Sequence, residues 1–499
     1  MEKYKNLVGG KLLEPAGGKY FQDINPADSG DVIGFFPDSD HRDIEQAVRC
    51  ATDAFFAWKD MPAPKRGDLI YKAALLLMEN QEKLAKVIVR EMGKTMPESM
   101  GDIQSSSDAA YFMAGEGRRM YGQTTFSALN RRWALTKRIP VGVCGLITAW
   151  NAPMAIITWK LFPALICGNT VVLKPSEEAP LTAYLLGEIL QKSGFPDGVV
   201  NIIYGTGSLA AEALVKNLSV RAVSFTGSTR VGRHISEECG RQMKKCSLEL
   251  GGKNGLIVMD DADINTAAKA TAVGAFSTAG QRCASTSRVF VHKNVYDFFI
   301  TQLIEETGKM KVGPGNDPET KVCPVINQEQ FNKIIRYVEE AVKSGAKLLY
   351  GGRALTEGNL AKGNFIEPTI LSDAALDSPL AQEEIFGPVL AVFKIDSIED
   401  AIEKLNSTDY GLTASVFTSN INSAMAALER IEAGCCYINA PTFGSEPHMP
   451  FGGLKNSGNG SREPGIQALE VFSEWQTVYI DYSGIVQNSQ FKSRWPELK

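Results

Sequence analysis

From Gly142 to Leu250 the chain repeats one unit, in which a short apolar segment is followed by a turn and a longer amphipathic segment. The short segments have the length of strands, and the longer ones place apolar residues three and four positions apart, as helices do. Strands joined in this way by helices lie parallel, with helices covering both faces of the sheet. The repeat therefore predicts an α/β fold with a mostly parallel sheet. The expected strands are Val143–Thr148, Thr170–Lys174, Val199–Tyr204, Ala222–Thr226 and Ser247–Leu250, and the expected helices are Met154–Cys167, Leu181–Lys192, Leu209–Lys216 and Val231–Cys239.

A second alternating series follows, and helical patterns precede the first. With 499 residues the chain exceeds what one core usually supports, so two or three domains are expected. The early helices are His41–Trp58, Pro64–Asn80 and Gln81–Thr95. The later segments are helices Ile264–Thr278, Tyr296–Thr307, Gln328–Ser344 and Ile398–Asn406, with strands Arg288–His292, Lys347–Tyr350, Val389–Lys394 and Ser415–Thr418.

Two strand-like segments, Arg131–Ile139 and Phe472–Tyr482, have no place in either series. An edge strand without a neighbour favours pairing with another chain. We therefore expect a homodimer or a dimer of dimers, that is, a homotetramer.

The composition excludes several classes of partner. The net charge of −5 gives no reason to expect nucleic acid or an anionic membrane surface. The four histidines have no cysteine or histidine at ligand spacing, so no metal site is expected. Nine scattered cysteines fit unpaired thiols in a reducing compartment, which favours the cytoplasm.

One uncharged stretch, Val141–Trp159, is long enough to examine for membrane insertion. It contains glycines and a proline, and Lys160 follows at once, so a buried strand turning into a helix is the better interpretation. The first residues also lack the apolar segment of a signal peptide.

The candidate nucleophile is Cys283, in the run Gly280-Gln281-Arg282-Cys283 after an alanine-rich helix. A lone cysteine is usually a small buried apolar residue. Here Gly280 ends the helix, so Cys283 is expected on a loop, where a nucleophile is accessible. A thiol on a loop, with a separate carboxylate that activates water, can form a thioester and then hydrolyse it.

Glu249 and Asn151 are the residues that would complete this chemistry. Glu249 follows an apolar strand and precedes Gly251-Gly252. It is either an ion-paired carboxylate or, in apolar surroundings that raise its pKa, a general base. Asn151 stands directly before Pro153 and a helix, where it is either a helix cap or a donor to an oxyanion.

These motifs together resemble the aldehyde dehydrogenase superfamily over nearly the whole chain. The resemblance rests on Glu249-Leu-Gly-Gly-Lys253, Gly280-Gln-x-Cys283 and Trp150-Asn151. It implies oxidation of an aldehyde with NAD or NADP. Cys283 would form a thiohemiacetal and then a thioester, Glu249 would activate water, and Asn151 would donate to the oxyanion together with the backbone N–H of Cys283. Lys160 and Glu463 match positions that relay protons.

The resemblance also implies a fold and a cofactor site. The expected architecture is a Rossmann-type dinucleotide-binding domain (1–121 and 143–252), an α/β catalytic domain (253–470) and a small β oligomerisation element (122–142 and 471–499). Taken alone, the cofactor motifs are plain strand-to-helix turns or solvated carboxylates. The residues expected to hold the cofactor are Trp150, Lys174, Ser176, Glu177, Gly207, Thr226, Gly227, Ser228, Gly232, Leu250, Glu384 and Phe386.

The segments 439–442, 448–453, 457–460 and 475–482 look like those of bacterial 2-oxoglutarate semialdehyde dehydrogenases. The substrate pocket would include Ala152, Ile156, Trp159, Ala284 and 443–448. Two alternatives stay open: an enzyme that passes the thioester to coenzyme A, and a non-catalytic binding protein on the same scaffold. The first generally lacks an acid at the position of Glu249, and the second need not keep Cys283, Glu249, Asn151 and Lys174 together. Glu177 suits a free ribose hydroxyl, whereas Lys174 and Ser176 suit a phosphate, so the choice between NAD and NADP also stays open.

Overall fold

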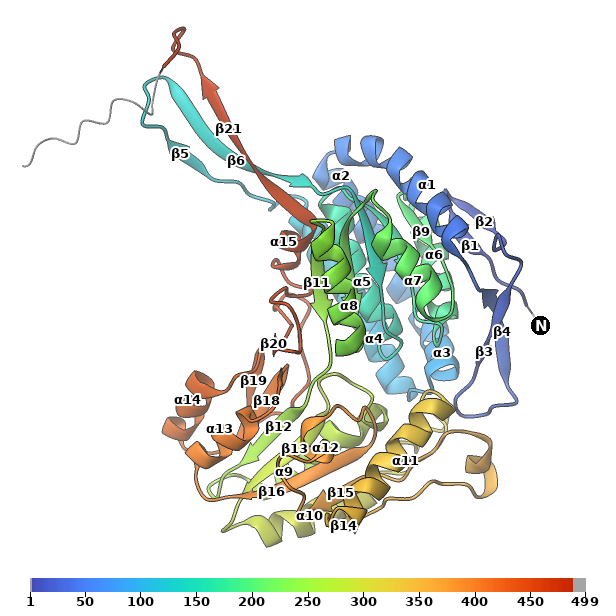
Figure 1. Cartoon of the computed structure of the whole chain (residues 1–499), viewed down its shortest axis with the longest axis vertical. Coiled ribbons are helices and arrows are strands. Elements are labelled where there is room, and N and C mark those ends of the chain that lie inside the picture. The colour runs from blue at the N-terminus through green and yellow to red at the C-terminus, as the bar shows by residue number, and fades with distance from the viewer. Residues whose placement is uncertain (1, 488–499) are drawn as a thin grey trace, which may run out of the picture.

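The alternating segments after residue 142 form one seven-stranded sheet in the computed structural model, which describes residues 2–487 (Figure 1). Its order is β11–β10–β7–β8–β9–β1–β2, and β7 to β11 run parallel. In chain order the five parallel strands therefore lie 3-2-1-4-5, the arrangement of a dinucleotide-binding fold. The strands are β1 (Asn6–Val8), β2 (Lys11–Leu13), β7 (Val143–Ile147), β8 (Thr170–Lys174), β9 (Val200–Ile202), β10 (Val220–Thr226) and β11 (Lys245–Glu249).

Helices cover both faces of this sheet, and every residue of β7, β8 and β9 is therefore buried. One face carries α1 (His41–Asp60), α7 (Gly207–Lys216) and α8 (Thr229–Arg241). The other face carries α5 (Pro153–Ile166) and α6 (Pro180–Ser193), with α2 (Ala63–Glu79), α3 (Gln81–Met92), α4 (Met96–Glu116) and α15 (Ala468–Phe472) packed outside them.

A second sheet of seven strands follows in the order β14–β15–β16–β13–β12–β18–β19, in which only β14 is antiparallel among the described strands. Its strands are β12 (Asn254–Val258), β13 (Thr286–His292), β14 (Lys347–Tyr350), β15 (Thr369–Ser372), β16 (Val389–Ile395), β18 (Thr413–Phe417) and β19 (Cys435–Ile438). One face is covered by α9 (Ile264–Phe276) and α10 (Tyr296–Gly308), and the other by α11 (Gln328–Lys343), α12 (Pro379–Gln382), α13 (Ile398–Asn406) and α14 (Ile421–Arg430). Two short pairs, β3 (Tyr20–Ile24) with β4 (Val32–Pro37) and β17 (Tyr410–Gly411) with β20 (Leu454–Lys455), complete the body.

The two segments that fit neither series pair with each other and project from the body as an arm (Figure 1). β21 (Ser473–Asp481) pairs antiparallel with β6 (Arg132–Pro140), which also pairs with β5 (Thr124–Phe126). Part of the expected oligomerisation element, residues 488–499, lies outside the described residues.

The fold class is as expected, and several boundaries are corrected. The helix expected to reach Thr95 ends at Met92, because Gly93 adopts φ = 82°. Phe472, expected in a strand, is the last residue of α15. The helix expected to reach Thr278 ends at Phe276, and a 3₁₀ turn, Ser277–Gly280, follows it.

None of the helices within residues 2–487 combines the length and the apolarity needed to cross a membrane.

Candidate active site

The site lies between the carboxyl ends of the strands of the first sheet and the loop that precedes β13. Parallel strands end at one edge, so β7, β8, β10 and β11 present the residues at and after their carboxyl ends together. Asn151 follows β7, and Thr226 and Glu249 are paired as the last residues of β10 and β11. The second domain contributes Cys283, on the loop before β13.

A cavity of about 460 Å³ collects these side chains. It is lined by Asn151, Thr226, Glu249, Leu250, Cys283 and Glu463, together with Ala152, Ile156, Trp159, Ala284, Phe443 and Ser445 of the expected substrate pocket. Residues predicted from two distant parts of the sequence therefore share one cavity.

The loop that carries Cys283 is held rigidly. Gln281 is fully buried, and its side chain donates to the carbonyls of Thr278 and Pro324 (3.1 Å each) and accepts from the N–H of Ile326 (2.9 Å). Gly280 has φ = 68°, and a Cβ there would lie 2.1 Å from the carbonyl oxygen of Gly387. The Gly-Gln-x-Cys pattern thus follows from packing, and Cys283 is half-buried at the end of this turn.

Asn254 was not singled out from the sequence, although it follows Lys253 directly. Its side-chain amide donates to the carbonyl oxygens of Cys283 (2.7 Å) and Ser285 (2.8 Å). It also accepts from the N–H of Thr413 (3.0 Å). A polar residue at the start of an apolar strand was the signal for this positioning role.

Glu249 is buried, and no group within residues 2–487 hydrogen-bonds to either of its carboxylate oxygens. Burial raises its pKa well above the usual value, and the negative charge of Glu463 adds to this effect. The ion-paired alternative is therefore not the arrangement found, whereas a carboxylate with a raised pKa and free oxygens suits a general base.

Asn151 does not cap the following helix. The N-cap of α5 is Ala152, and the helix begins at Pro153 without a side-chain cap. Asn151 is 7% exposed and lines the cavity, so its amide is available there for a ligand.

Lys160 and Glu463 form a buried ion pair, of which Glu463 lines the cavity. The Lys160 Nζ donates to both carboxylate oxygens of Glu463 (2.7 and 2.9 Å), and the side chains are 0% and 3% exposed. The hydroxyls of Ser224 and Ser247 also donate to Glu463 Oε1, at 2.7 and 3.1 Å. Ser247 stands two residues before Glu249 on β11, so the pair is linked to the strand that carries the candidate base.

The acid Glu384 influences the thiol of Cys283. Burial raises the pKa of the Cys283 thiol to about 12, and the charges of Glu384 and Glu249 contribute. Glu384 accepts from the N–H of Gly252 (2.9 Å), and its pKa is raised by burial. The thiol of the cofactor-free protein is therefore protonated near neutral pH.

The residues expected to hold a dinucleotide form three groups, the third of which is the turn between β10 and α8. Lys174 pairs with Glu177 (3.0 Å), whose other oxygen accepts from the N–H of Gly207 (3.2 Å). Ser176, with its hydroxyl accepting from the N–H of Glu178 (3.3 Å), lies in the same turn. In the second group, Phe386 packs edge-on against Trp150 with ring centroids 5.5 Å apart.

The turn between β10 and α8 has the geometry of an anion-binding helix start. Ser228 caps α8, and a Cβ on Gly227 would lie 2.4 Å from the ring of Phe225. A Cβ on Gly232 would lie 2.4 Å from Leu250, so the glycines let helix and strand approach closely. The donors, the paired acid and the glycine turns fit a dinucleotide.

Two exposed apolar side chains near this turn were missed from the sequence. Leu209 (67% exposed) and Val231 (38% exposed) stand in the first turns of the neighbouring helices α7 and α8. The signal available in the sequence was an apolar residue shortly after each glycine turn, and the exposure of both side chains suits a flat, apolar ring such as adenine.

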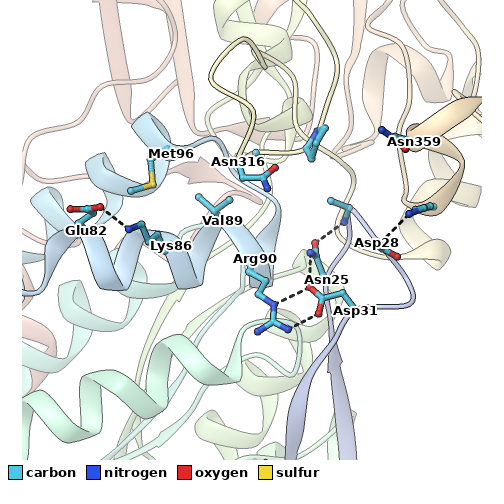
Figure 2. Close-up of a pocket in the computed structure, with 14 residues that line it drawn as sticks. Asn25, Asp28, Asp31, Glu82, Lys86, Val89, Arg90, Met96, Asn316 and Asn359 are labelled. Atoms are coloured by element: carbon cyan, nitrogen blue, oxygen red, sulfur yellow. Dashed lines mark hydrogen bonds and ion pairs between the residues drawn. The ribbon is translucent and has the colours of Figure 1, made fainter. Parts of the chain in front are cut away.

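A wider cavity of about 900 Å³ lies between α3 and loops of both domains (Figure 2). Its charged side chains neutralise one another, because Arg90 pairs with Asp31 and Lys86 pairs with Glu82 (2.7 Å). None of the predicted site residues lines it, whereas Cys283, Glu249 and Asn151 all line the smaller cavity.

A model of the aldehyde dehydrogenase family matches residues 13–478. The chain belongs to this family. It is 40% identical over 482 residues to the 2,5-dioxopentanoate dehydrogenase of Saccharolobus solfataricus, covering 96% of this chain and 99% of that protein. It is 38% identical over 477 residues to the α-ketoglutaric semialdehyde dehydrogenase of Bacillus subtilis, covering 96% and 98%. An NAD-dependent aldehyde dehydrogenase from Sinorhizobium meliloti superposes with a TM-score of 0.94 at 35% identity, covering 98% and 97%.

The protein is therefore an NAD(P)-dependent aldehyde dehydrogenase that oxidises an aldehyde to a carboxylic acid. The predicted resemblance to 2-oxoglutarate semialdehyde dehydrogenases is confirmed at the level of these relatives. The roles of the individual site residues stay predictions.

Proposed function

We propose that this enzyme oxidises 2-oxoglutarate semialdehyde to 2-oxoglutarate, with Cys283 as the nucleophile and Glu249 as the base that releases the acid. The relatives named for this aldehyde support the substrate. The observation that carries the mechanism is the buried carboxylate of Glu249, whose oxygens have no partner within residues 2–487 and which shares a cavity with Cys283.

The first half of the reaction takes place on Cys283. The thiol of Cys283 loses its proton to solvent water, and the resulting thiolate attacks the aldehyde carbon to give a thiohemiacetal oxyanion, to which the side-chain amide of Asn151 and the backbone N–H of Cys283 donate. A bound NAD(P) would supply the acceptor for the hydride that leaves the former aldehyde carbon, and loss of that hydride from the oxyanion leaves the acyl group on Cys283 as a thioester. Lys174, Glu177, Ser228 and Glu384 are the polar residues that would hold the dinucleotide.

The second half depends on Glu249. With its raised pKa it takes a proton from a water molecule, and the resulting hydroxide attacks the thioester and frees the acid and the thiol. Glu463 lines the same cavity and is bonded to Lys160, so these two residues carry the proton away from Glu249. The acid at position 249 also argues against transfer of the acyl group to coenzyme A.

The test of this function is a set of initial rates with Cys283→Ala and the wild type, using 2-oxoglutarate semialdehyde and either cofactor. The variant should keep NAD(P) binding, measured by quenching of tryptophan fluorescence, and lose at least about a hundredfold in turnover because covalent catalysis is lost. If the variant retained its turnover, the assignment of Cys283 as the nucleophile would be wrong. A wild-type rate that required coenzyme A would contradict hydrolysis.

We also propose a homodimer or homotetramer held together by the arm. The outer edges of β21 and β5 meet no further strand within residues 2–487. The arm exposes Trp475 (47%), Tyr479 (58%) and Phe126 (101%), apolar area that a second copy would cover.

A cytoplasmic location is our last proposal here. It is supported by the nine cysteines, all of which are free thiols, as a reducing compartment keeps them.

A further inference from the structure

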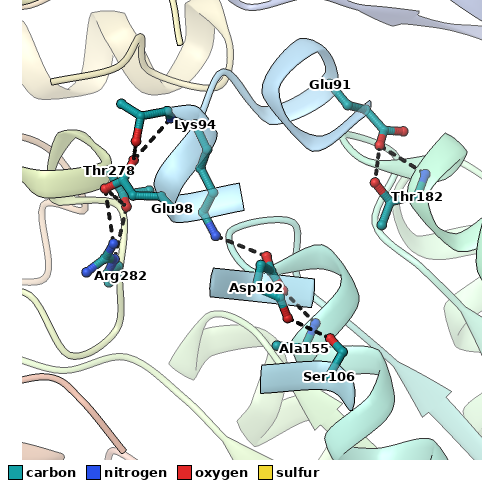
Figure 3. A network of polar contacts seen from close by, with 10 residues as sticks. Glu91, Lys94, Glu98, Asp102, Ser106, Ala155, Thr182, Thr278 and Arg282 are labelled. Carbon is teal, nitrogen blue, oxygen red and sulfur yellow. Dashed lines mark hydrogen bonds and ion pairs between the residues drawn. The ribbon is translucent and has the colours of Figure 1, made fainter. Parts of the chain in front are cut away.

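Arg282 directly precedes the nucleophile and lines the same cavity. The Cα atoms of adjacent residues are about 3.8 Å apart, so its long side chain extends into the space beside Cys283. Lys94 lies just before α4, and Glu98 and Asp102 stand in its first two turns, in a network of polar contacts that includes Arg282 (Figure 3). The cavity lining therefore includes two cationic side chains, Lys94 and Arg282.

Lys94 is already committed to another group. Its ammonium bonds to Asp102 Oδ2 (3.1 Å), and the two side chains are 5% and 1% exposed. Asp102 Oδ1 in turn accepts from the N–H of Ala155 (2.8 Å), which anchors the pair to α5. A ligand anion would have to break a buried ion pair to reach Lys94.

Arg282 is held in place by hydrogen bonds, but only part of its N–H groups take part in them. Its Nε donates to Thr278 Oγ1 (2.9 Å), its Nη2 donates to Glu98 Oε1 (3.1 Å), and its guanidinium lies 4.6 Å from the ring centre of Phe443. A guanidinium has five N–H groups. Two are bonded, and no acceptor within residues 2–487 meets the remaining ones. The side chain is still 23% exposed.

The backbone before Arg282 fixes its direction. Thr278 and Ala279 adopt φ = 54° and 53°, a strained left-handed conformation for residues with a Cβ. Thr278 is fully buried and donates to Glu98 Oε1 (2.8 Å), which holds the turn in place. The free N–H groups of Arg282 are therefore oriented before a substrate arrives.

We propose that Arg282 binds the carboxylate of the substrate and so selects aldehydes that carry an acid group at the far end of a short chain. This inference rests on the proposed function, because 2-oxoglutarate semialdehyde is such an ω-oxo acid. The planar guanidinium donates two parallel hydrogen bonds to one carboxylate, a geometry that an ammonium group lacks. Because Glu98 offsets its charge, the selection depends on these directed donors more than on net charge. Ser105 and Ser445 also line the cavity and offer hydroxyls to the 2-oxo oxygen.

The test compares two aldehydes of equal chain length, 5-oxopentanoate, which is an anion, and pentanal, which is neutral. The readout is the ratio of kcat/KM for the anion to that for pentanal, measured for the wild type and for Arg282→Met. The ratio should fall at least about 30-fold, the effect of losing charge-assisted hydrogen bonds. Arg282→Lys keeps the positive charge but loses the two parallel N–H donors of the guanidinium. The ratio of kcat/KM values should fall at least about fivefold in this variant.

Two controls separate binding from folding. Arg353→Met removes an exposed arginine that pairs with Glu367 beside the second sheet, and it should leave the ratio unchanged. The double variant Glu98→Gln, Arg282→Gln leaves no unpaired buried charge and should show the same selective loss as Arg282→Met.

Each further outcome has one meaning. If Arg282→Met and the double variant lower kcat/KM for both aldehydes by the same factor, Arg282 only positions the loop and the proposal is overturned. If the wild type prefers the anion and the variants keep this preference, the carboxylate binds elsewhere. If the wild type itself oxidises pentanal as efficiently as 5-oxopentanoate, the proposed semialdehyde function fails instead.

Discussion

Replacing Glu463 by glutamine should make the hydrolytic step start at lower pH. The negative charge of Glu463 raises the pKa of Glu249, whereas the positive charge of Lys160 lowers it. Glu463→Gln removes the negative charge that raises this pKa and leaves the positive charge of Lys160, which lowers it. The pKa of Glu249 should therefore fall, and since its carboxylate form is the base, the rising limb of the pH–rate profile should move to lower pH.

Stability should change at the same time. Lys160 is 0% exposed, and its ammonium lies 2.7 Å from Glu463. Removing one partner of a buried ion pair costs about 3–5 kcal/mol, because the other charge stays buried without compensation. Glutamine still offers its oxygen to Lys160, so we expect the lower end of that range.

The matched variant is Lys160→Met, which removes the opposite charge. It should raise the pKa of Glu249 and move the rising limb to higher pH, while the free energy of unfolding falls by a similar amount. The assay is kcat under deacylation-limited conditions across pH, with urea unfolding followed by circular dichroism. Limbs that move in the same direction in both variants, or that do not move, would refute the electrostatic coupling between the pair and Glu249.

Three further predictions concern the thiol, the cofactor and the assembly. Burial raises the pKa of the Cys283 thiol to about 12, so alkylation of the cofactor-free enzyme by iodoacetamide should accelerate about tenfold per pH unit above neutrality; a plateau below pH 9 would indicate a stabilised thiolate. Glu177→Gln frees Lys174 from its acid, so the ratio of kcat/KM with NADP to that with NAD should rise about tenfold, and an unchanged ratio would show that the pair does not contact the ribose. Charging the arm with Trp475→Glu and Tyr479→Glu should reduce the mass measured by light scattering to that of a monomer, and an unchanged mass would show that the arm does not hold the copies together.

The parallel strands, and the residues at their carboxyl ends, could be predicted from the sequence alone. Apolar runs such as Thr170–Lys174 are buried on both faces and can be recognised without tertiary information. Because parallel strands end at one edge, the positions of Lys174, Thr226 and Glu249 followed from their strands. The approach of Cys283 from the second domain came only from the family resemblance.

Helix α4 shows why other parts could not be predicted. Its buried face includes Ser106, Ser107 and Asp102 among apolar residues, which interrupts the pattern that marks a helix. Ser106 bonds to the carbonyl of Asp102 (2.8 Å), and Ser107 to that of Ala74 (3.1 Å), so these polar groups are satisfied by contacts that sequence spacing does not reveal. The role proposed for Arg282 depends on this same helix through Glu98, and it became visible only in the structure.

The central claim, a thioester on Cys283 that Glu249 helps to hydrolyse, is tested most directly by one rapid-mixing measurement on Glu249→Gln. Glutamine cannot take a proton from water, so the acyl group should form and then persist. Mixed with excess aldehyde and NAD(P), the variant should release reduced cofactor in a burst of up to one equivalent per active site and then turn over very slowly. Intact mass spectrometry should find the acyl group on Cys283. No burst until the pH is raised would assign Glu249 to deprotonation of the thiol, and undiminished steady turnover would contradict the account altogether.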